Sequence, residues 1–433
     1  MKRYLWLAAA LLTLVSAKPT RADNRFIVRS SLGGSLLSRL CLLQSCTVVT
    51  AIDGTLNQVF LLTTPSIIDP TIFLNLLRRT PGVVDAELDQ VFNLVGGLNV
   101  LTTPPAGLTD SAPINYFGTT VWSGYANQPA SGIVHVQDAQ NAFQVSGTGI
   151  VADIDTGVDP NHPALNSVLL AGYDFTRNQP GGSEMTDFTS PAPPPCPDCQ
   201  PAIVNQSTAA VLDQSTAAVL DGNVQYAAFG HGTMVMGVVH LVAPNAQLLP
   251  LKAFHSDGTG YLSDILRAIY YAAQNNANVI NMSFDFKTPS QELSSALDYA
   301  NQLNIICVAS AGNDGAMETV YPAVLQTDVM GVASTSDIDT RSTFSNFGNA
   351  IVWVAAPGEA IITTYPFSTY SAGSGTSFSA PFVSGGAALL RALRTGINQS
   401  LASDAIAHAQ FVGANMGNGR MDLLMALGAS SPR

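Results

Sequence analysis

The chain has 433 residues, of which 47% are hydrophobic and 11% charged, so it is long enough to bury a sizeable core and to carry an accessory domain. Its 18 Lys and Arg residues are outnumbered by 30 Asp and Glu residues, which gives a formal net charge of -12. This acidic balance, with no basic cluster after the first few positions, excludes nucleic acid as an expected partner.

The first residues are typical of a secretory signal peptide. "MKRYLWLAAALLTLVSAKPTRA" places Lys2 and Arg3 before an apolar run, which small residues follow. The run is too short to span a bilayer, and no later segment is long and apolar enough to do so. We therefore expect residues 1–17 to be removed, with cleavage after Ala22 as an alternative, and the protein to be secreted to the periplasm or the extracellular space.

A small α/β unit is predicted over residues 24–95. The segments "RFIV", "VVTAI", "QVFLLTT" and "VVDAELDQVF" have the composition of strands, and "PTIFLNLLRRT" has that of a helix. Residues 96–125 are rich in Gly, Pro and Thr and have no clear period, which indicates a linker and a domain boundary.

The five cysteines fall into two close pairs and a single residue. Cys41 lies near Cys46 and Cys196 near Cys199, so two disulfides that close short loops are compatible with export. Cys307 lies in the apolar run "NIICVAS", where a buried, inert thiol is expected.

Apolar strand runs alternate with segments of helical period over residues 126–428. This alternation predicts a mostly parallel sheet flanked by helices, with sites at the carboxyl ends of the strands. Residues 177–228 interrupt the pattern, because they are polar, rich in Pro and Gly, and contain "QSTAAVLD" twice in tandem from Gln206 and Gln214. Two copies are too few for a solenoid, so a surface insertion is predicted.

Two segments offer an acid and a base. "IVADIDTGVD" places Asp155 at the end of a strand, where it could orient an imidazole, and the lack of a second D-[TS]-G argues against an aspartic dyad. "FGHGTM" places His231 between two glycines at the start of an apolar helix. Its spacing from His240 does not fit a zinc-binding helix.

Two more segments offer an amide and a hydroxyl. "ASAGNDG" ends a strand in Asn313, whose amide could donate to an oxyanion, although the segment also suits an ordinary turn. "GSGTSFSAP" holds Ser374, Ser377 and Ser379 before an apolar helix. Hydroxyls at such a position most often cap the helix, so a nucleophile requires support from the other segments.

Together these segments resemble the subtilisin-like serine peptidases. The order Asp155, His231, Asn313, Ser377 and the flanks "IDTGVD", "HGT", "SAGNDG" and "GTSFSAP" are similar to those of the family, and Asp, His, Ser is the subtilisin order. Further segments such as "STFSNFG", "VAAPG" and "GNGRMDLLMAL" extend the resemblance over about residues 126–428. It implies a three-layer α/β/α fold with a mostly parallel sheet.

The resemblance also implies roles for these residues. Ser377 would be the nucleophile, His231 the base that takes its proton, and Asp155 the group that orients the imidazole. Asn313 and the backbone N–H of Ser377 would form the oxyanion hole. The 24–95 unit, with "LLRRTPGVVDAELDQ", is similar to the family's ferredoxin-like propeptide, which acts as folding chaperone and intramolecular inhibitor, so maturation within residues 96–125 is expected.

The substrate-binding edges follow from the same resemblance. "DGTGY" and "SFDF" align with the two edges that hold an extended peptide by β-pairing. The residues implicated are Gly258, Thr259, Gly260, Tyr261, Ser283, Phe284 and Asp285. An apolar preference is the family default, but Asp285 and Phe286 stand where small glycines are usual. Either side chain could narrow the primary pocket, and Asp285 would favour a basic side chain if it points inward.

Two further positions depart from the family pattern. Met234 replaces a histidine often found three residues after the catalytic one, which should alter packing rather than mechanism. Ala164 replaces an aspartate that binds calcium in many members, so that calcium site is expected to be missing and no cofactor is predicted.

The leading prediction is a secreted, monomeric serine endopeptidase that is made as a zymogen and hydrolyses polypeptide substrates through an acyl-enzyme intermediate. The alternative is a catalytically masked or inactive binding protein of the same fold, because the "SFDF" edge and the 177–228 insertion could block access to the cleft. A transpeptidase, in which an amine resolves the acyl-enzyme, uses the same residues and no feature of the sequence favours it.

Overall fold

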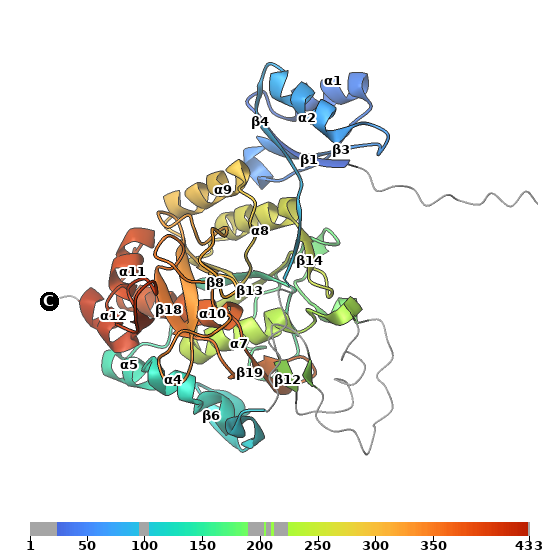
Figure 1. Cartoon of the computed structure of the whole chain (residues 1–433). Coiled ribbons are helices and arrows are strands. Elements are labelled where there is room, and N and C mark those ends of the chain that lie inside the picture. Colours follow the sequence, from blue (N-terminus) through green and yellow to red (C-terminus); the bar gives the residue numbers. More distant parts are fainter. Residues whose placement is uncertain (1–23, 95–103, 189–202, 205–208, 212–223, 432–433) are drawn as a thin grey trace, which may run out of the picture.

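The computed structural model describes residues 24–94, 104–188, 203–204, 209–211 and 224–431. The predicted signal peptide, the "CPDC" pair Cys196 and Cys199, and most of the repeated octapeptide lie outside the described residues. The chain forms a small N-terminal unit that sits on a larger α/β domain (Figure 1).

The N-terminal unit is a four-stranded antiparallel sheet with two helices on one face, in the strand order β2-β3-β1-β4. Its elements are β1 (Asn24–Ser30), α1 (Gly34–Gln44), β2 (Thr47–Ala51), β3 (Val59–Thr64), α2 (Pro70–Arg79) and β4 (Val83–Leu88), with a short 3-10 turn η1 (Gly54–Leu56). The element order β-α-β-β-α-β is that of the ferredoxin-like motif. Alternation along β1 sends Phe26 and Val28 into the core under the two helices, whereas Ile27 faces the larger domain.

Two details of this unit differ from the sequence prediction. Helix α1 was not predicted, because Leu42 and Leu43 are 86% and 81% exposed and blur the helical period of its apolar residues. The single strand predicted over residues 83–92 is two strands: β4 stays in the N-terminal sheet, and β5 (Val91–Asn93) pairs with β14 (Thr259–Tyr261) of the larger domain.

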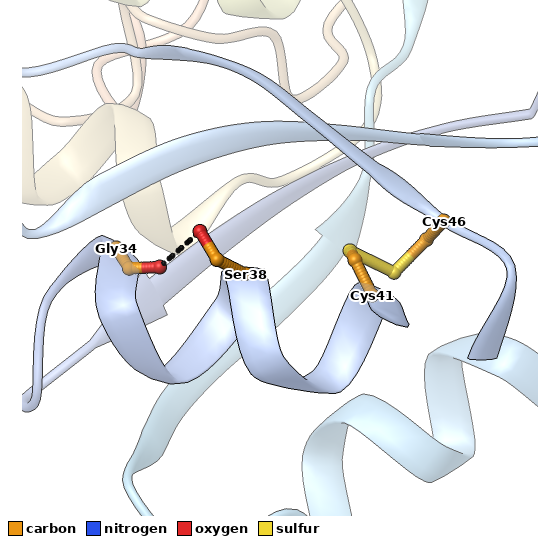
Figure 2. The surroundings of a disulfide bond; sticks show 4 residues. All are labelled: Gly34, Ser38, Cys41 and Cys46. Carbon is orange, nitrogen blue, oxygen red and sulfur yellow. Dashed lines mark hydrogen bonds between the residues drawn. A yellow bond between two sulfur atoms is a disulfide. The ribbon is translucent and has the colours of Figure 1, made fainter. Parts of the chain in front are cut away.

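A disulfide closes the end of α1 onto the start of β2. Figure 2 shows Cys41 and Cys46 joined, with an S–S distance of 2.03 Å, and Ser38 donating to the carbonyl oxygen of Gly34 one turn earlier in the helix. This pairing is one of the two that the cysteine spacing suggested. Cys307 is fully buried, as predicted, and burial raises the pKa of its thiol.

The larger domain is built on a ten-stranded sheet with the order β10-β9-β13-β8-β15-β16-β17-β18-β22-β21. The parallel strands in its middle are β8 (Ile150–Asp155), β13 (Gln247–Lys252), β15 (Val279–Met282), β16 (Ile306–Ser310), β17 (Met330–Thr335) and β18 (Val354–Pro357). The short outer strands are β9 (Tyr173–Asp174), β10 (Gln179–Pro180), β21 (Ala409–Gln410) and β22 (Arg420–Met421). The predicted parallel sheet is confirmed.

Helices cover both faces of this sheet, which gives the three layers that the resemblance implied (Figure 1). One face packs against α7 (His231–Val242) and α10 (Thr376–Leu393), and the other against α8 (Leu262–Gln274) and α9 (Gln291–Gln302). The remaining helices are α3 (Ser123–Ala126), α4 (Pro129–Ile133), α5 (Val136–Phe143), α11 (Gln399–Ile406) and α12 (Leu423–Ser430). Gly385 lets α10 approach α7, because a Cβ at this position would lie 2.5 Å from the Cβ of Val242.

The region predicted as a linker is partly folded. Residues 95–103 lie outside the described residues, but residues 104–125 contain the 3-10 turn η2 (Ala106–Thr109) and a hairpin of β6 (Pro113–Tyr116) and β7 (Thr119–Trp122). Leu108 and Tyr125 are fully buried in the main core. The linker prediction is therefore wrong for residues 104–125, since their aromatic and leucine side chains pack against the larger domain.

The predicted surface insertion also begins inside the fold. Residues 179–188 hold β10 and the 3-10 turn η3 (Met185–Asp187), and Glu184 is 0% exposed. Further along, β11 (Ile203–Val204) and β12 (Ala209–Val211) extend the hairpin of β19 (Ile361–Tyr365) and β20 (Thr369–Gly373), and the 3-10 turn η4 (Val224–Tyr226) leads to α7. Within the described ranges, none of the helices combines the length and apolar character that crossing a bilayer requires.

Candidate active site

The centre of the candidate site is a contact between Asp155 and His231. Asp155 is the last residue of β8 and His231 the first of α7, and both are buried. The Nδ1 atom of His231 lies 2.7 Å from Oδ1 and 2.9 Å from Oδ2 of Asp155. A carboxylate that accepts from Nδ1–H fixes the tautomer in which Nε2 can accept a proton.

The surroundings of His231 favour its protonated form. Burial lowers the pKa of His231, but the charge and hydrogen bond of Asp155 and the charge of Glu184 outweigh it, so the net shift is upward. Nε2 of His231 is buried and has no hydrogen-bond partner within the described part of the chain. The ring therefore has one nitrogen anchored and the other free to take a proton.

Ser377 lies in the first turn of α10 and is 5% exposed. Its hydroxyl donates to the carbonyl oxygen of Ser283 at 3.0 Å and is not hydrogen-bonded to His231, whose Nε2 has no partner among the described residues. The following residue, Phe378, brings its ring centroid to 5.9 Å from that of His231. Ser377 thus directly precedes a residue whose ring lies beside the imidazole, and its own hydroxyl donates to a different acceptor.

The neighbouring serines have other surroundings. The hydroxyl oxygen of Ser374 accepts from the backbone N–H of Ala360 at 2.8 Å, and Ser379 is fully buried with a hydroxyl that has no partner among the described residues. Neither lies among the residues that line the pocket at Ser377.

Asn313 follows β16 and is held by the residue before Ser377. Its Oδ1 accepts from the backbone N–H of Thr376 at 2.8 Å and from the hydroxyl of Thr376 at 3.0 Å. Because the amide oxygen is occupied in this way, the NH₂ group of Asn313 is the end left to face the pocket beside Ser377. This is the orientation that an oxyanion donor needs.

A pocket of about 170 Å³ opens at Ser377. Its lining comes from four segments of the chain and comprises Asn93, Leu94, Ser283, Phe284, Asp285, Phe286, Lys287, Asn313, Asp314 and Ser377. Asp285 lines this space, and its carboxyl lies against the main chain of Gly312, since a Cβ on Gly312 would lie 2.9 Å from Oδ2 of Asp285. Burial and the charge of Asp314 raise the pKa of Asp285 to about 7, against the charge of Lys287.

The edge formed by β14 is already paired with the protein's own chain. β5 runs antiparallel to it, with Asn93 opposite Thr259 and Val91 opposite Tyr261, and the N–H of Leu94 donates to the carbonyl oxygen of Gly258 at 2.9 Å. The ring of Phe92 stacks on that of Phe286 with centroids 4.0 Å apart. The N-terminal unit therefore ends in the same pocket that Ser377 and Asn313 line.

The predicted positions divide accordingly. The structure brings together Asp155 and His231, and it gathers Ser283, Phe284, Asp285, Asn313 and Ser377 around one pocket, while Gly258, Thr259, Gly260 and Tyr261 form the paired edge. Phe284 is 4% exposed and packs on Phe254 in the core.

Met234 and Ala164 are fully buried. Within the described ranges no group of three or more His, Cys, Asp and Glu residues is suited to a metal ion.

Two charged residues near the site were missed by sequence reasoning. Lys252 is fully buried at the end of β13, where its Nζ donates to the oxygens of Thr156 (2.8 Å) and Phe254 (2.6 Å) and to the carboxylate of Asp187 (2.7 Å). A lone lysine closing the apolar run "AQLLPLKAF" was the available signal. Glu184 gave none, because it lies in an irregular loop.

Comparisons with known proteins agree with this geometry. The model of the Subtilase family matches residues 147–420, a span that holds Asp155, His231, Asn313 and Ser377. The thermophilic serine proteinase of Bacillus sp. (strain AK1) is 31% identical over 308 residues, which cover 70% of this chain and 67% of that protein. Thermitase of Thermoactinomyces vulgaris is 34% identical over 258 residues, 58% of this chain and 78% of its own. Subtilisin BL of Lederbergia lenta is 36% identical over 171 residues, 37% of this chain and 63% of its own.

Proposed function

Because the chain belongs to the subtilase family, we propose that it is a serine endopeptidase that hydrolyses polypeptide substrates with Asp155, His231 and Ser377 as its catalytic triad. The observation that carries the proposal is the buried imidazole of His231, with Nδ1 held by Asp155 at 2.7 Å and Nε2 without a partner among the described residues. Such a ring is prepared to accept a proton and has no structural bond to lose when it does.

The chemistry follows from these positions. The Ser377 hydroxyl turns from Ser283 toward Nε2 of His231, gives up its proton and attacks the scissile carbonyl carbon. The negative oxygen that forms receives hydrogen bonds from the Asn313 amide and the Ser377 backbone N–H. His231 then protonates the leaving amine, which departs and leaves an acyl ester on Ser377. Water gives a proton to His231 and attacks this ester, and His231 returns the proton to the oxygen of Ser377 as the acid product leaves.

We further propose that residues 24–94 are an inhibitory propeptide and that the chain is a zymogen. Support comes from β5, which occupies the β14 edge, and from contacts that dock the unit onto two helix starts. Asp89 accepts from the backbone N–H of Ser263 at the start of α8 (2.8 Å), and Glu87 accepts from the hydroxyl of Ser290 before α9 (2.6 Å). Arg29 pairs with Glu292 at 2.6 Å.

Location and assembly are part of the same proposal. Residues 1–17 would direct export and be removed during it, and the Cys41–Cys46 disulfide suits an oxidising compartment outside the cytoplasm. We propose a secreted monomer that needs no cofactor for the chemistry, since the groups named above supply the base, the nucleophile and the oxyanion donors.

We also propose that Asp285 makes the primary pocket favour a cationic substrate side chain. Within the part of the chain that the structure describes, Asp285 makes no hydrogen bond or ion pair, and the carboxylates of Asp314 and Glu318 lie near it. Lys287 is already engaged by those two carboxylates, at 3.5 and 3.0 Å. A lysine or arginine side chain entering the pocket would supply the missing positive partner.

A masked or inactive binding protein is the second candidate. The features that favour it are the Ser377 hydroxyl bonded to Ser283 and the cleft filled by β5. Both features also fit an uncleaved zymogen. The two candidates differ in whether the precursor cleaves itself over time.

The deciding experiment is intact mass spectrometry of the precursor without residues 1–17, comparing the native chain with Ser377→Ala over several hours. A zymogen splits between residues 95 and 103 only when Ser377 is present. If neither chain splits, the masked protein is favoured. Equal splitting of both chains would point to a contaminating peptidase. The purification would then be repeated, first on the Ser377→Ala chain, until that chain stays intact, and the comparison would be made again.

A further inference from the structure

Glu184 is a fully buried carboxylate that the proposed chemistry does not use. It lies between β10 and η3, and its two oxygens take three hydrogen bonds. Oε2 accepts from the hydroxyl of Thr156 at 3.0 Å and from the backbone N–H of Gly230 at 2.6 Å. Oε1 accepts from the hydroxyl of Thr233.

These donors flank the two residues of the Asp–His pair. Thr156 follows Asp155 directly, and Gly230 precedes His231 directly. The hydroxyl oxygen of Thr156 also accepts from the N–H of Gly232 at 3.0 Å, which closes a small network around His231. One side chain from a distant loop thus holds the end of β8 and the start of α7 at a fixed separation.

We propose that Glu184 is a positioning residue for the Asp155–His231 pair, acting both through its grip on Thr156 and Gly230 and through its negative charge beside the imidazole. This inference rests on the proposed peptidase function for its kinetic consequences, but the geometry of the pair and the titration of His231 exist whether or not the protein cleaves peptides.

A carboxylate suits this place better than a neutral side chain. Three donors converge on it, whereas the amide of glutamine offers one accepting oxygen and would have to reverse a threonine hydroxyl. Burial raises the pKa of Glu184 to about 7, although the hydrogen bonds from Thr233, Gly230 and Thr156 and the charge of Lys252 act in the opposite direction. At and above neutral pH its charge is therefore available to act on His231.

Few charged groups act on the imidazole of His231. The charge of Asp155 and the charge of Glu184 both raise the pKa of His231. Other ionisable groups that face Glu184 or this pair are Asp153, Asp187, Lys252 and Tyr365. Asp153 is fully buried, and burial and the charge of Asp155 raise its pKa well above the usual range. Because the charge of Glu184 acts on His231, the acid limb of activity should report both groups together.

The test uses two variants that separate the grip from the charge. Glu184→Gln removes the charge and keeps the shape, whereas Thr156→Val removes one hydrogen bond and keeps the charge. The titration of His231 is followed by NMR in the full-length chain carrying Ser377→Ala, so that this readout needs no activity. The pH profile of kcat/KM is then measured on matured enzyme with an unblocked peptide substrate.

We expect Glu184→Gln to move the His231 titration and the acid limb of kcat/KM to lower pH. Thr156→Val should leave the titration near its native position and lower kcat by roughly 10-fold with little change in KM, as misplacement of a catalytic group does. Asp264→Asn, which removes another buried carboxyl on α8, serves as the control for loss of stability and should move neither quantity.

Two results would overturn the proposal. One is an unchanged His231 titration in Glu184→Gln, and the other is a Thr156→Val enzyme whose kcat equals that of Asp264→Asn. If the native chain cleaves no peptide at all, the proposed function fails while the NMR result still decides the role of Glu184. If Glu184→Gln does not fold, Thr156→Val and Thr233→Val carry the test.

Discussion

The hydroxyl of Ser377 donates to the carbonyl oxygen of Ser283, 3.0 Å away, while Nε2 of His231 is left without a partner among the described residues. The proposed nucleophile and its proposed base are therefore not hydrogen-bonded to each other in the form in which β5 is paired with the β14 edge. For the proposed reaction this hydroxyl must turn toward Nε2, and departure of the N-terminal unit would give a substrate access to the pocket.

Reactivity toward a fluorophosphonate tests this relationship directly. We expect the matured enzyme to be labelled at Ser377 about 100-fold faster than the precursor, because general-base catalysis contributes at least that much and β5 blocks the pocket. Labelling is measured by intact mass. Ser374→Ala should label like the native enzyme and Ser377→Ala should not label, and equal rates for precursor and matured enzyme would contradict the prediction.

Removal of the Asn313 amide should slow catalysis without weakening binding. Asn313→Ala is expected to lower kcat by about 10² to 10³ with KM nearly unchanged, the cost of losing one oxyanion donor. Thr376→Val deletes the hydroxyl that orients the amide but keeps the backbone N–H bond at 2.8 Å, so its loss should be smaller. Steady-state kinetics on one peptide give both constants, and a change confined to KM would rule out the oxyanion role.

The preference for a cationic side chain should depend on pH. Because the pKa of Asp285 is raised to about 7, its carboxyl is neutral below that pH and ionised above it, while a substrate lysine stays charged throughout. The ratio of kcat/KM for a lysine peptide over its leucine counterpart should therefore rise as the pH increases through 7. Asp285→Asn should flatten the ratio, and a flat ratio in the native enzyme would mean that the carboxyl does not contact the substrate.

Residues at the ends of regular elements were the part of the site that sequence could predict. Asp155, His231 and Ser377 each fall where an apolar run of strand or helical period begins or ends, so pattern and motif pointed to the same positions. Glu184 could not be found in this way, because its three partners lie in segments 28 to 49 positions away and its own loop has no period.

The same reason explains the errors in the fold. A single strand was predicted over residues 83–92 because the apolar character is continuous, whereas β5 leaves the N-terminal sheet to pair with β14, far along the chain. The supposed linker at residues 104–125 looked irregular, but it is held by contacts of Leu108 and Tyr125 with the main core. Neither the pairing of β5 with β14 nor the packing of residues 104–125 on the main core produces a pattern in the neighbouring sequence.

Docking of the N-terminal unit should weaken as the pH rises. In the docked state burial raises the pKa of Glu87 to about 7. Glu87 also accepts a hydrogen bond from the hydroxyl of Ser290 there. The docked unit therefore holds a proton that the free unit loses at lower pH, so docking is favoured below the ordinary glutamate pKa and loses this contribution as the pH passes through about 7.

Inhibition of matured enzyme by its released N-terminal unit measures this effect. We expect the inhibition constant to be roughly 10-fold weaker at pH 8 than at pH 5.5, since each unit of pKa shift corresponds to a factor of ten. Glu87→Gln should bind with much less dependence on pH. The matched control is Asp69→Asn, which alters a carboxylate that caps α2 within the unit, away from the larger domain.

Lys252 should be among the costliest polar residues to remove. Its Nζ is 0% exposed and is bonded to Asp187 and to two backbone oxygens, one of them from Thr156 beside Asp155. Among the described residues, Lys252→Met leaves the carboxylate of Asp187 with Arg177 as its one remaining charged partner and removes the donor from the two backbone oxygens, so the free energy of unfolding should fall by about 3 to 5 kcal/mol. Urea unfolding in the Ser377→Ala background avoids self-digestion. Lys287→Met, which breaks an exposed pair with Asp314 and Glu318, should cost at most about 1 kcal/mol. Equal losses of unfolding free energy in the two variants would show that the buried contacts of Lys252 stabilise the fold no more than an exposed ion pair does. The segment at Asp155 would then be held by its backbone contacts alone.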